Sequence, residues 1–154
     1  MLVFRIARSL YARDLSGEGA RLYGNRWNSP GTAILYTAES RALALVEVWA
    51  SSGGDLLGDD FDLLELKLPT DKGLFATLKS LPDGWDSLPP LPPSRQVGDA
   101  FVRAGALLGL WVPSVVVPAE RNLLLNPRHP AMAKVKVQTV KPFSVDPRME
   151  ANRL

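Results

Sequence analysis

The 154-residue sequence predicts a single α+β domain with mainly antiparallel sheets and flanking helices. The length lies within the range of one domain, and the 46% hydrophobic content is enough for one core. Strand-like segments recur along the chain, whereas two segments have helical spacing. The strand-like segments near the C-terminus follow one another without crossover helices, so they are expected to pair in antiparallel fashion.

The first half of the chain is expected to contain two strands, a long loop and one helix. "LVFRIA", residues 2–7, has the β-branched and aromatic content of a strand. Residues 13–31 hold four glycines, one proline and two asparagines, which predicts a loop whose length is typical of functional segments. "TAILYTA", residues 32–38, is the second strand. Ser40 is the expected N-cap of a helix over 41–52, which two glycines end.

The second half is expected to begin with an alternating strand and to end with short strands. Five prolines in residues 80–94 predict a non-helical excursion, after which helical spacing returns. We assign the domain to residues 1–144 and a mobile or partner-docking tail to 145–154. The remaining expected elements are a strand at 61–69, a helix at 95–109, an apolar β-prone run at 110–118, and two strands at 121–130 and 134–143 joined by an Asn-Pro turn.

Composition excludes several classes of protein. The 18 basic and 16 acidic residues give a net charge of +2, too small for a protein that coats nucleic-acid phosphates. The absence of cysteine excludes disulfides, thiolate metal sites and a cysteine nucleophile, and is compatible with a reducing cytosol. Arg5 and Arg8 interrupt the N-terminal apolar stretch, and no apolar run reaches membrane-spanning length. We expect a cytoplasmic protein with neither membrane nor direct nucleic-acid binding.

Familiar cofactor motifs are missing. The "GEG" at residues 17–19 lacks the third glycine of a dinucleotide-binding turn and is not expected to precede a helix, and there is no P-loop. His129, the one histidine, cannot form a zinc site by itself, so no metal is expected. A hydrogen bond that stabilises a turn is the favoured role of His129, with general-base catalysis as the alternative.

Glu47 is the main candidate for a functional acid, because apolar residues flank it on both sides in the sequence. It lies either on a solvated outer face of its helix or on the wall of an internal cleft. Its neighbours one helical turn away favour the cleft wall, because they are more apolar than an outer face usually is. A carboxylate there needs a cationic partner or a cationic transition state. These neighbours are Leu43, Ala44, Ala50 and Ser51.

Residues suited to binding anions and flat rings come shortly before this helix. Arg21 and Arg26 can hold phosphates through their guanidinium groups, and Tyr36 can stack on a heteroaromatic ring. The alternative for Arg26 is a surface salt bridge. For Trp27 we favour packing in the core over binding.

Six stretches occur in order along the chain: "FRIA", "LSGEGARLYGNRWN", "AILYTAES", "ALVEV", "VPS" and "NLLLNPRHP". Together they resemble the RES-domain toxins of RES/Xre-type toxin–antitoxin systems, over nearly the whole chain. The family is named for an arginine, a glutamate and a serine, which correspond to Arg5, Glu47 and Ser114, with Tyr36 and Arg26 as further site residues. The usual Gly-Gly-Arg-Trp reads Gly-Asn-Arg-Trp at 24–27, and asparagine tolerates positive φ.

The resemblance implies an ADP-ribosyltransferase-like fold with NAD, the substrate, in a cleft between strands. Glu47 would stabilise the positive charge that develops on the ribose as nicotinamide leaves. Tyr36 would stack on the nicotinamide, while Arg5 and Arg26 would hold the pyrophosphate. Ser114 would hydrogen-bond the substrate or orient Glu47, or simply cap a strand.

The resemblance also implies a partner and leaves the reaction partly open. Members of the family pair with an antitoxin that carries a helix-turn-helix DNA-binding region and blocks the toxin's cleft. They consume NAD as glycohydrolases or phosphorylases, or modify a protein. Water, phosphate or a protein side chain could therefore accept the ADP-ribose. A non-catalytic nucleotide-binding module is the alternative outside the enzymes.

Overall fold

A computed structural model describes residues 1–54, 56 and 60–149 of the chain. Seven strands form one sheet in the order β4-β5-β6-β2-β1-β3-β7. All neighbours are antiparallel except β4 and β5, which are parallel. The single α+β domain with mainly antiparallel pairing is thus confirmed. The strands are β1 (Leu2–Arg8), β2 (Leu35–Ala38), β3 (Phe61–Lys67), β4 (Phe75–Thr77), β5 (Gly109–Pro113), β6 (Arg121–Leu125) and β7 (Lys136–Phe143).

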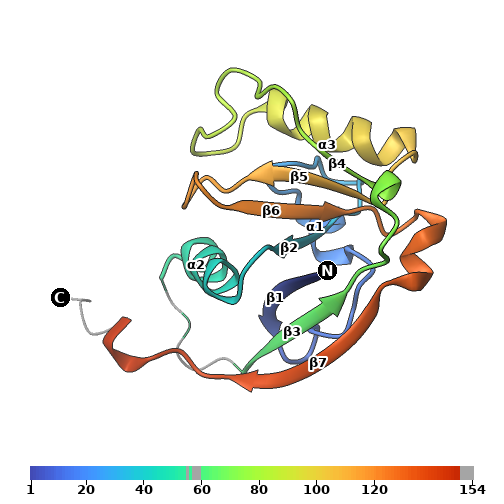
Figure 1. Ribbon diagram of the computed structural model, residues 1–154. Coiled ribbons are helices and arrows are strands. Elements are labelled where there is room, and N and C mark those ends of the chain that lie inside the picture. The colour runs from blue at the N-terminus through green and yellow to red at the C-terminus, as the bar shows by residue number, and fades with distance from the viewer. Residues whose placement is uncertain (55, 57–59, 150–154) are drawn as a thin grey trace.

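Two longer helices, α2 (Arg41–Ser51) and α3 (Pro92–Ala104), pack on the same face of the sheet. Along β2, Tyr36 and Ala38 point to one face of the sheet and Leu35 points to the other. Ala38 belongs to the apolar cluster under α2, and Tyr36 packs on the cluster under α3. Figure 1 shows the sheet as strongly curved, with α2 on its concave side and α3 above β5. The opposite face, which includes Leu35, is covered partly by the 3-10 turn Pro130–Lys134.

The start and end of α2 follow the sequence closely. Ser40 Oγ accepts a hydrogen bond from the Leu43 amide at 3.0 Å, as expected of an N-cap. Beyond the helix, Gly53 and Gly54 have φ values of 68° and 78°, a left-handed conformation that glycine adopts without steric cost. The helix that carries Glu47 is therefore defined by local chemistry at both ends.

Several expected elements differ from the structure. The predicted loop at 13–31 contains a short helix, α1 (Glu18–Tyr23), which begins within the "GEG" stretch, so the expectation that no helix follows there is wrong. The excursion at 80–94 ends earlier than predicted because α3 begins at Pro92; the first turn of a helix tolerates proline, whose missing N–H has no partner there. The apolar run at 110–118 leaves the sheet after Pro113, and β4 was not predicted at all.

The sequence analysis expected an Asn-Pro turn to join the last two strands, but these strands lie far apart in the sheet. β6 pairs with β2 and β5, whereas β7 pairs with β3 at the far edge of the sheet. His129 caps the 3-10 turn between them, because its Nδ1 accepts a hydrogen bond from the Ala131 amide at 3.1 Å. This is the turn-stabilising role that the sequence favoured.

After β7, the described residues up to Met149 lie below α2 (Figure 1). Val145, in the predicted tail, packs against the same apolar cluster as Phe143. A 3-10 turn follows at Pro147–Met149, and residues 150–154 of the predicted tail lie outside the described residues. None of the helices in the described ranges has the length and apolar content needed to cross a membrane.

Candidate active site

Glu47 lies on the side of α2 that faces the ends of β5 and β6. Its Oε1 accepts two hydrogen bonds, from Ser114 Oγ at 2.7 Å and from Asn122 Nδ2 at 2.6 Å. The acid is therefore turned toward the sheet rather than placed on an outer face. Within the described part of the chain, Oε2 has no hydrogen-bond donor.

Ser114 follows β5 directly and is fully buried. Its Oγ accepts hydrogen bonds from the amides of Val116 and Val117 at 3.1 and 3.0 Å. Because a hydroxyl has one proton and two acceptor positions, the proton of Ser114 is left for Glu47. The turn after β5 thus fixes Ser114 as a donor to the carboxylate.

Asn122 was missed by the sequence analysis. It is the second residue of β6 and shares its face with Leu124, which is fully buried. An amide in register with core-facing leucines in "RNLLL" is the pattern that could have identified it. Its partner Glu47 lies 75 positions away in the sequence, so the contact itself has no local pattern.

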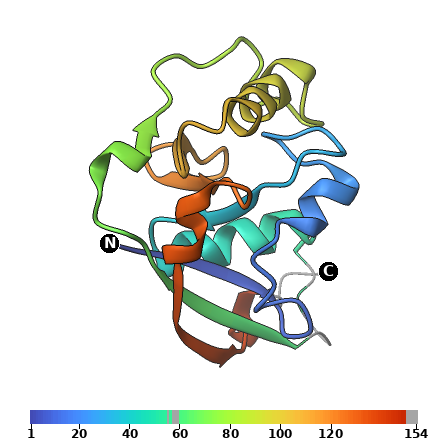
Figure 2. The same ribbon diagram turned by 90° about the vertical axis from the view of Figure 1, so that its right-hand side faces the viewer.

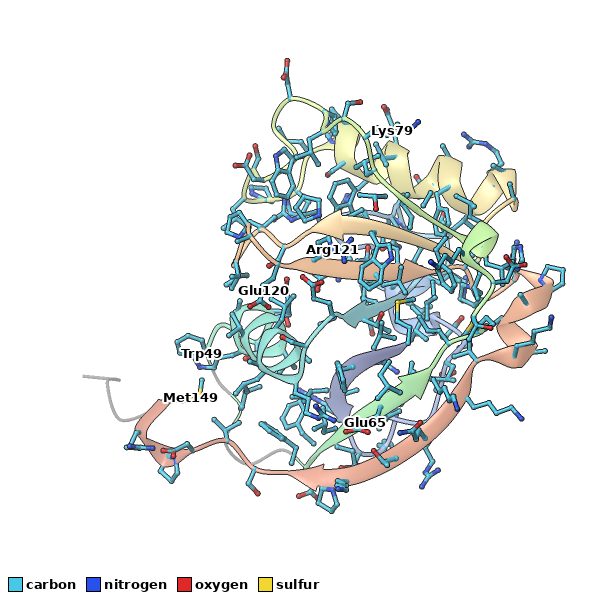
Figure 3. The ribbon with its side chains drawn as sticks, viewed as in Figure 1. Trp49, Glu65, Lys79, Glu120, Arg121 and Met149 are labelled. Carbon is cyan, nitrogen blue, oxygen red and sulfur yellow. The ribbon has the colours of Figure 1, made fainter. Side chains whose placement is uncertain are left out.

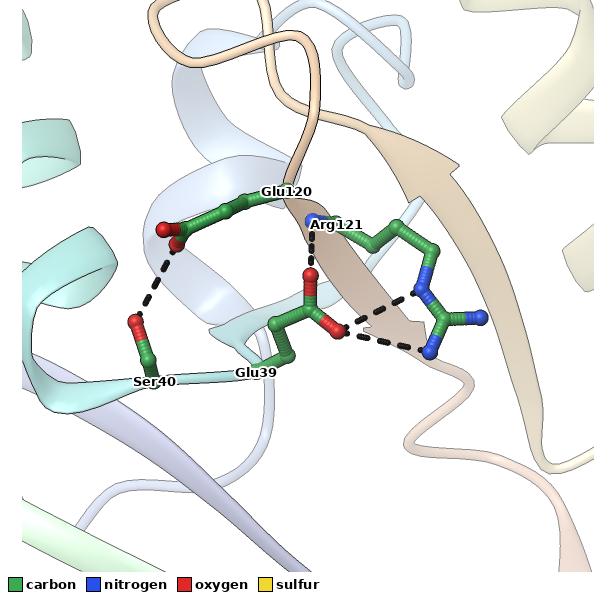
Figure 4. Close-up of polar contacts among 4 residues, drawn as sticks. All are labelled: Glu39, Ser40, Glu120 and Arg121. Atoms are coloured by element: carbon green, nitrogen blue, oxygen red, sulfur yellow. Dashed lines mark hydrogen bonds and ion pairs between the residues drawn. The ribbon is translucent and has the colours of Figure 1, made fainter.

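A polar clamp joins the start of α2 to the start of β6 (Figure 4). The Glu39 carboxylate accepts hydrogen bonds from the Arg121 amide at 2.6 Å and from its guanidinium at 3.3 Å. Ser40 Oγ donates to Glu120 Oε2 at 3.2 Å. Figure 3 shows Glu120 beside α2. These contacts hold the start of α2 beside the start of β6, the strand from which Asn122 reaches Glu47.

Tyr36, in the middle of β2, is held at its hydroxyl. The hydroxyl donates to Asn28 Oδ1 at 2.8 Å and accepts from the Trp27 amide at 3.1 Å. Burial raises the pKa of the Tyr36 phenol well above its ordinary value, so the ring is neutral at physiological pH. Tyr36 can thus serve as a binding surface but not as a base.

Asn28 is fully buried and is a second residue that the sequence analysis missed. Its Nδ2 donates to the carbonyls of Ala20, Ser29 and Thr32, at 2.8, 3.2 and 2.9 Å. The side chain therefore ties the segment before β2 together and presents Oδ1 to Tyr36. Hydrogen bonds from one side-chain amide to several backbone carbonyls leave no recognisable pattern in the sequence.

Arg26 holds the proline-rich connection that precedes α3. Its NH1 donates to the carbonyls of Trp85 and Ser87 at 2.8 and 2.9 Å, and it forms no salt bridge with any of the residues that the structure describes. Burial lowers the pKa of Arg26, whereas the negative charges of Asp86 and Glu47 act in the opposite direction. Arg26 is therefore close enough to Glu47 to feel its charge.

The segment around Arg26 packs firmly against the rest of the fold. Trp27 is 3% exposed and stacks on Trp85, with ring centroids 6.1 Å apart, which confirms the prediction that it belongs to the core. The left-handed φ of this turn is carried by Gly24, at 70°, and no non-glycine residue in the described ranges has a positive φ. Asn25 therefore does not need the tolerance that the sequence analysis invoked.

Arg5 lies apart from this group. It alternates along β1 with Phe4 and Ile6, which pack in the cluster under α2, so its side chain points to the other face of the sheet. There NH1 donates to the carbonyls of Ala12 and Asp14 at 3.4 and 3.0 Å. Burial lowers the pKa of Arg5, and the nearby Asp14 partly opposes this.

The structure thus brings Glu47 and Ser114 into direct contact, places Arg26 within electrostatic reach of Glu47, and turns Arg5 away. Tyr36 lies on the same sheet face as Asn122, in the neighbouring strand. Arg21 forms an exposed ion pair with Glu18 at 2.6 Å. In residues 1–54, 56 and 60–149, no group of three or more potential metal-ligating His, Cys, Asp or Glu side chains is found.

Comparison with known proteins identifies the family. The model of the RES domain matches residues 2–147. The chain belongs to the RES-domain family. A protein of Sphingobium sp. (strain YBL2) named "Prs ADP-ribosylating toxin" is 43% identical over 148 residues, which cover 93% of this chain and 91% of the relative. A "Toxin Res" of Photorhabdus laumondii is 36% identical, with 97% of both chains covered.

A solved structure supports the fold independently. A chain from the crystal structure of the Mycobacterium tuberculosis MbcT–MbcA toxin–antitoxin complex superimposes with a TM-score of 0.76. The match covers 93% of this RES-domain chain and 84% of the other, at 20% sequence identity. At that identity the comparison shows a shared fold.

Proposed function

We propose that this RES-domain protein is the toxin of a toxin–antitoxin pair and consumes NAD by breaking the bond between nicotinamide and ribose. The observation that carries this proposal is the arrangement of Glu47, whose Oε1 is fixed by two donors while Oε2 is left without one. The name of the Sphingobium relative, an ADP-ribosylating toxin, supports NAD as the substrate.

The chemistry follows from the charge that the reaction creates. When the nicotinamide–ribose bond breaks, its electron pair leaves with nicotinamide and the ribose becomes positively charged. A carboxylate oxygen placed nearby in advance stabilises this charge without reorganisation. Glu47 Oε2 would serve this purpose. Nicotinamide leaves as a neutral molecule, so no general acid is needed to protonate it. The proposed mechanism therefore requires one carboxylate, that of Glu47.

The other site residues would bind the rest of NAD. Tyr36, neutral and fixed at its hydroxyl, would offer its ring to the nicotinamide. Arg26 uses NH1 for the carbonyls of the 85–87 segment, which leaves Nε and NH2 for the pyrophosphate. Arg5 would contribute from the other face by holding the backbone of residues 12–14. Ser114 and Asn122 would orient Glu47.

A second candidate function is transfer of ADP-ribose to a protein side chain, which the name of the Sphingobium relative favours. The bond that breaks is the same, and the nucleophile alone differs. Incubation of the purified protein with NAD, with and without phosphate, separates the candidates. Free ADP-ribose indicates hydrolysis, a phosphorylated ADP-ribose formed only with phosphate indicates phosphorolysis, and label retained on added cell protein indicates transfer.

The same assay tests the proposal as a whole. Release of nicotinamide under any of these conditions supports NAD cleavage. If NAD binds but no nicotinamide is released, even with cell extract present, the chain is a nucleotide-binding module and the proposed activity is wrong.

A further inference from the structure

A groove of about 640 Å³ lies between α3 and the segment that precedes β2. It is found at the Leu35 end of β2, whereas Asn122 and Glu47 lie at the Ala38 end, so the groove is separate from the candidate active site. Its volume is within the range of small-molecule sites. The lining residues are Ser29, Pro30, Gly31, Thr32 and Ala33, then Asp99, Val102 and Arg103 of α3, and Arg128.

The charged groups of the groove favour an anion. In the described part of the chain, the side chains of Arg103 and Arg128 have neither a hydrogen bond nor an ion pair. The acid of the lining, Asp99, is already engaged, because its two oxygens accept from the amide and the hydroxyl of Ser29 at 2.9 and 2.6 Å. Two free guanidinium groups beside a satisfied carboxylate suit a phosphate group, which arginine binds through paired hydrogen bonds.

Gly31 and Thr32, in the lining of the groove, are also suited to a ligand. Gly31 has a φ of 100°, and a Cβ placed there would have no atom within 4 Å, so the backbone is open to approach. The hydroxyl of Thr32 makes no hydrogen bond to the described residues. Figure 2 shows the segment before β2 running beside α3, so the two walls come from elements far apart in sequence.

A chain of hydrogen bonds leads from this groove to Tyr36. Asn28 Nδ2 donates to the carbonyls of Ser29 and Thr32, which line the groove, and Asn28 Oδ1 accepts from the Tyr36 hydroxyl. The Trp27 amide donates to the same hydroxyl. A ligand that moves the backbone of residues 29–32 would therefore move the groups that hold Tyr36.

We propose that the groove is a second binding site, which takes the phosphate group of a small phosphorylated molecule and whose occupancy is transmitted through Asn28 to Tyr36. Binding at the groove does not depend on the proposed NAD cleavage. The site can therefore be tested in Glu47→Gln protein, in which the proposed activity is removed and the groove is untouched.

The test follows the backbone amides of ¹⁵N-labelled Glu47→Gln protein by NMR during titration with glycerol 3-phosphate and, separately, with inorganic phosphate. The amides of Gly31, Thr32 and Val102 are expected to shift with saturation. The further variant Arg103→Ala/Arg128→Ala should bind about tenfold more weakly, because two charged hydrogen-bond donors are lost. The matched control, Lys136→Ala/Lys141→Ala on β7, loses the same charge and should bind as the parent does.

Each part of the proposal can fail separately. If the shifts occur at Ser114 and Asn122 instead of the groove, or if both double variants weaken binding equally, the groove is not a phosphate site. Binding of inorganic phosphate that is as tight as that of glycerol 3-phosphate would overturn the assignment to a phosphorylated molecule. If the groove amides shift but the Trp27 amide does not, the link to Tyr36 is wrong.

Discussion

At the scale of single residues, the two oxygens of Glu47 have different surroundings. Oε1 is fixed by Ser114 and Asn122, and Ser114 is itself fixed by two backbone amides. The carboxylate therefore has one orientation, in which Oε2 is the oxygen available to a substrate. In the proposed mechanism, Ser114 and Asn122 do not contact NAD, and each acts by orienting Glu47.

We predict that Asn122→Ala lowers kcat for nicotinamide release by up to about 100-fold with a much smaller change in KM, because misplacement of a catalytic group affects the chemical step most. Steady-state kinetics of the purified variant measure both parameters. Gln138→Ala, which removes an exposed amide on β7, is the matched control and should behave as wild type. A kcat for Asn122→Ala within twofold of wild type would remove Asn122 from the site.

The second residue-scale prediction concerns Arg26. Arg26→Lys keeps the charge but loses the planar fork, so NAD affinity should fall by about tenfold. Calorimetry with NAD on the Glu47→Gln background measures this without turnover. Arg41→Lys, at an exposed ion pair with Glu65, provides the control. Equal affinities for the two lysine variants would show that Arg26 does not bind the pyrophosphate.

At the scale of elements, α3 positions the segment that carries Arg26. Ser94 Oγ donates to the Arg26 carbonyl at 2.8 Å, and Asp99 holds Ser29. Between them, Gly98 lets the helix backbone approach so closely that a Cβ there would lie 1.6 Å from the Trp27 carbonyl oxygen. A glycine in mid-helix is thus explained by packing rather than by backbone conformation.

Gly98→Ala should destabilise the protein by about 3 kcal/mol, the upper end of the usual cost of overpacking, because the methyl group collides with backbone. Denaturant unfolding measures the change. Gly19→Ala is the matched control: its Cβ would meet nothing within 4 Å and it lies inside α1, so it should be neutral or slightly stabilising. Equal stability of the two variants would contradict the close approach of α3.

The elements also show where the sequence was informative. α2 was predicted within one residue because a serine cap and two glycines mark its ends, and the inward direction of Glu47 followed from its apolar neighbours. By contrast, β4 has three residues and depends on pairing with β5, more than thirty positions away. The contact of Asn122 with Glu47 was missed for the same reason, since the two residues lie 75 positions apart. Asn28 was missed although its partners are near in sequence, because its hydrogen bonds depend on the folded shape of the segment before β2.

At the scale of the whole molecule, one curved sheet holds the candidate site and the proposed second site at opposite ends of β2. Membership of the RES-domain family and the fold shared with a chain of a toxin–antitoxin complex support control by a partner protein. We propose an antitoxin with a helix-turn-helix DNA-binding region. A segment of it would block access to Glu47 and place an anionic group against Arg26.

Expression in cells tests this control. The wild-type chain alone should arrest growth and deplete cellular NAD, because nothing in the proposed mechanism limits turnover. Glu47→Gln should do neither, and co-expression of the product of the neighbouring gene should restore growth and NAD with the wild-type chain. Healthy growth and normal NAD in cells that accumulate the lone wild-type protein would contradict the toxin assignment.

The central claim is that Glu47 stabilises the positive charge formed when NAD loses nicotinamide, and one comparison tests it most directly. Nicotinamide release is measured for purified wild-type and Glu47→Gln proteins at the same NAD concentration, with circular dichroism to show that both are folded. The account predicts release by the wild type and a loss of at least about 100-fold in the variant, as for removal of one charge-stabilising group. Normal NAD consumption by folded Glu47→Gln protein would contradict it.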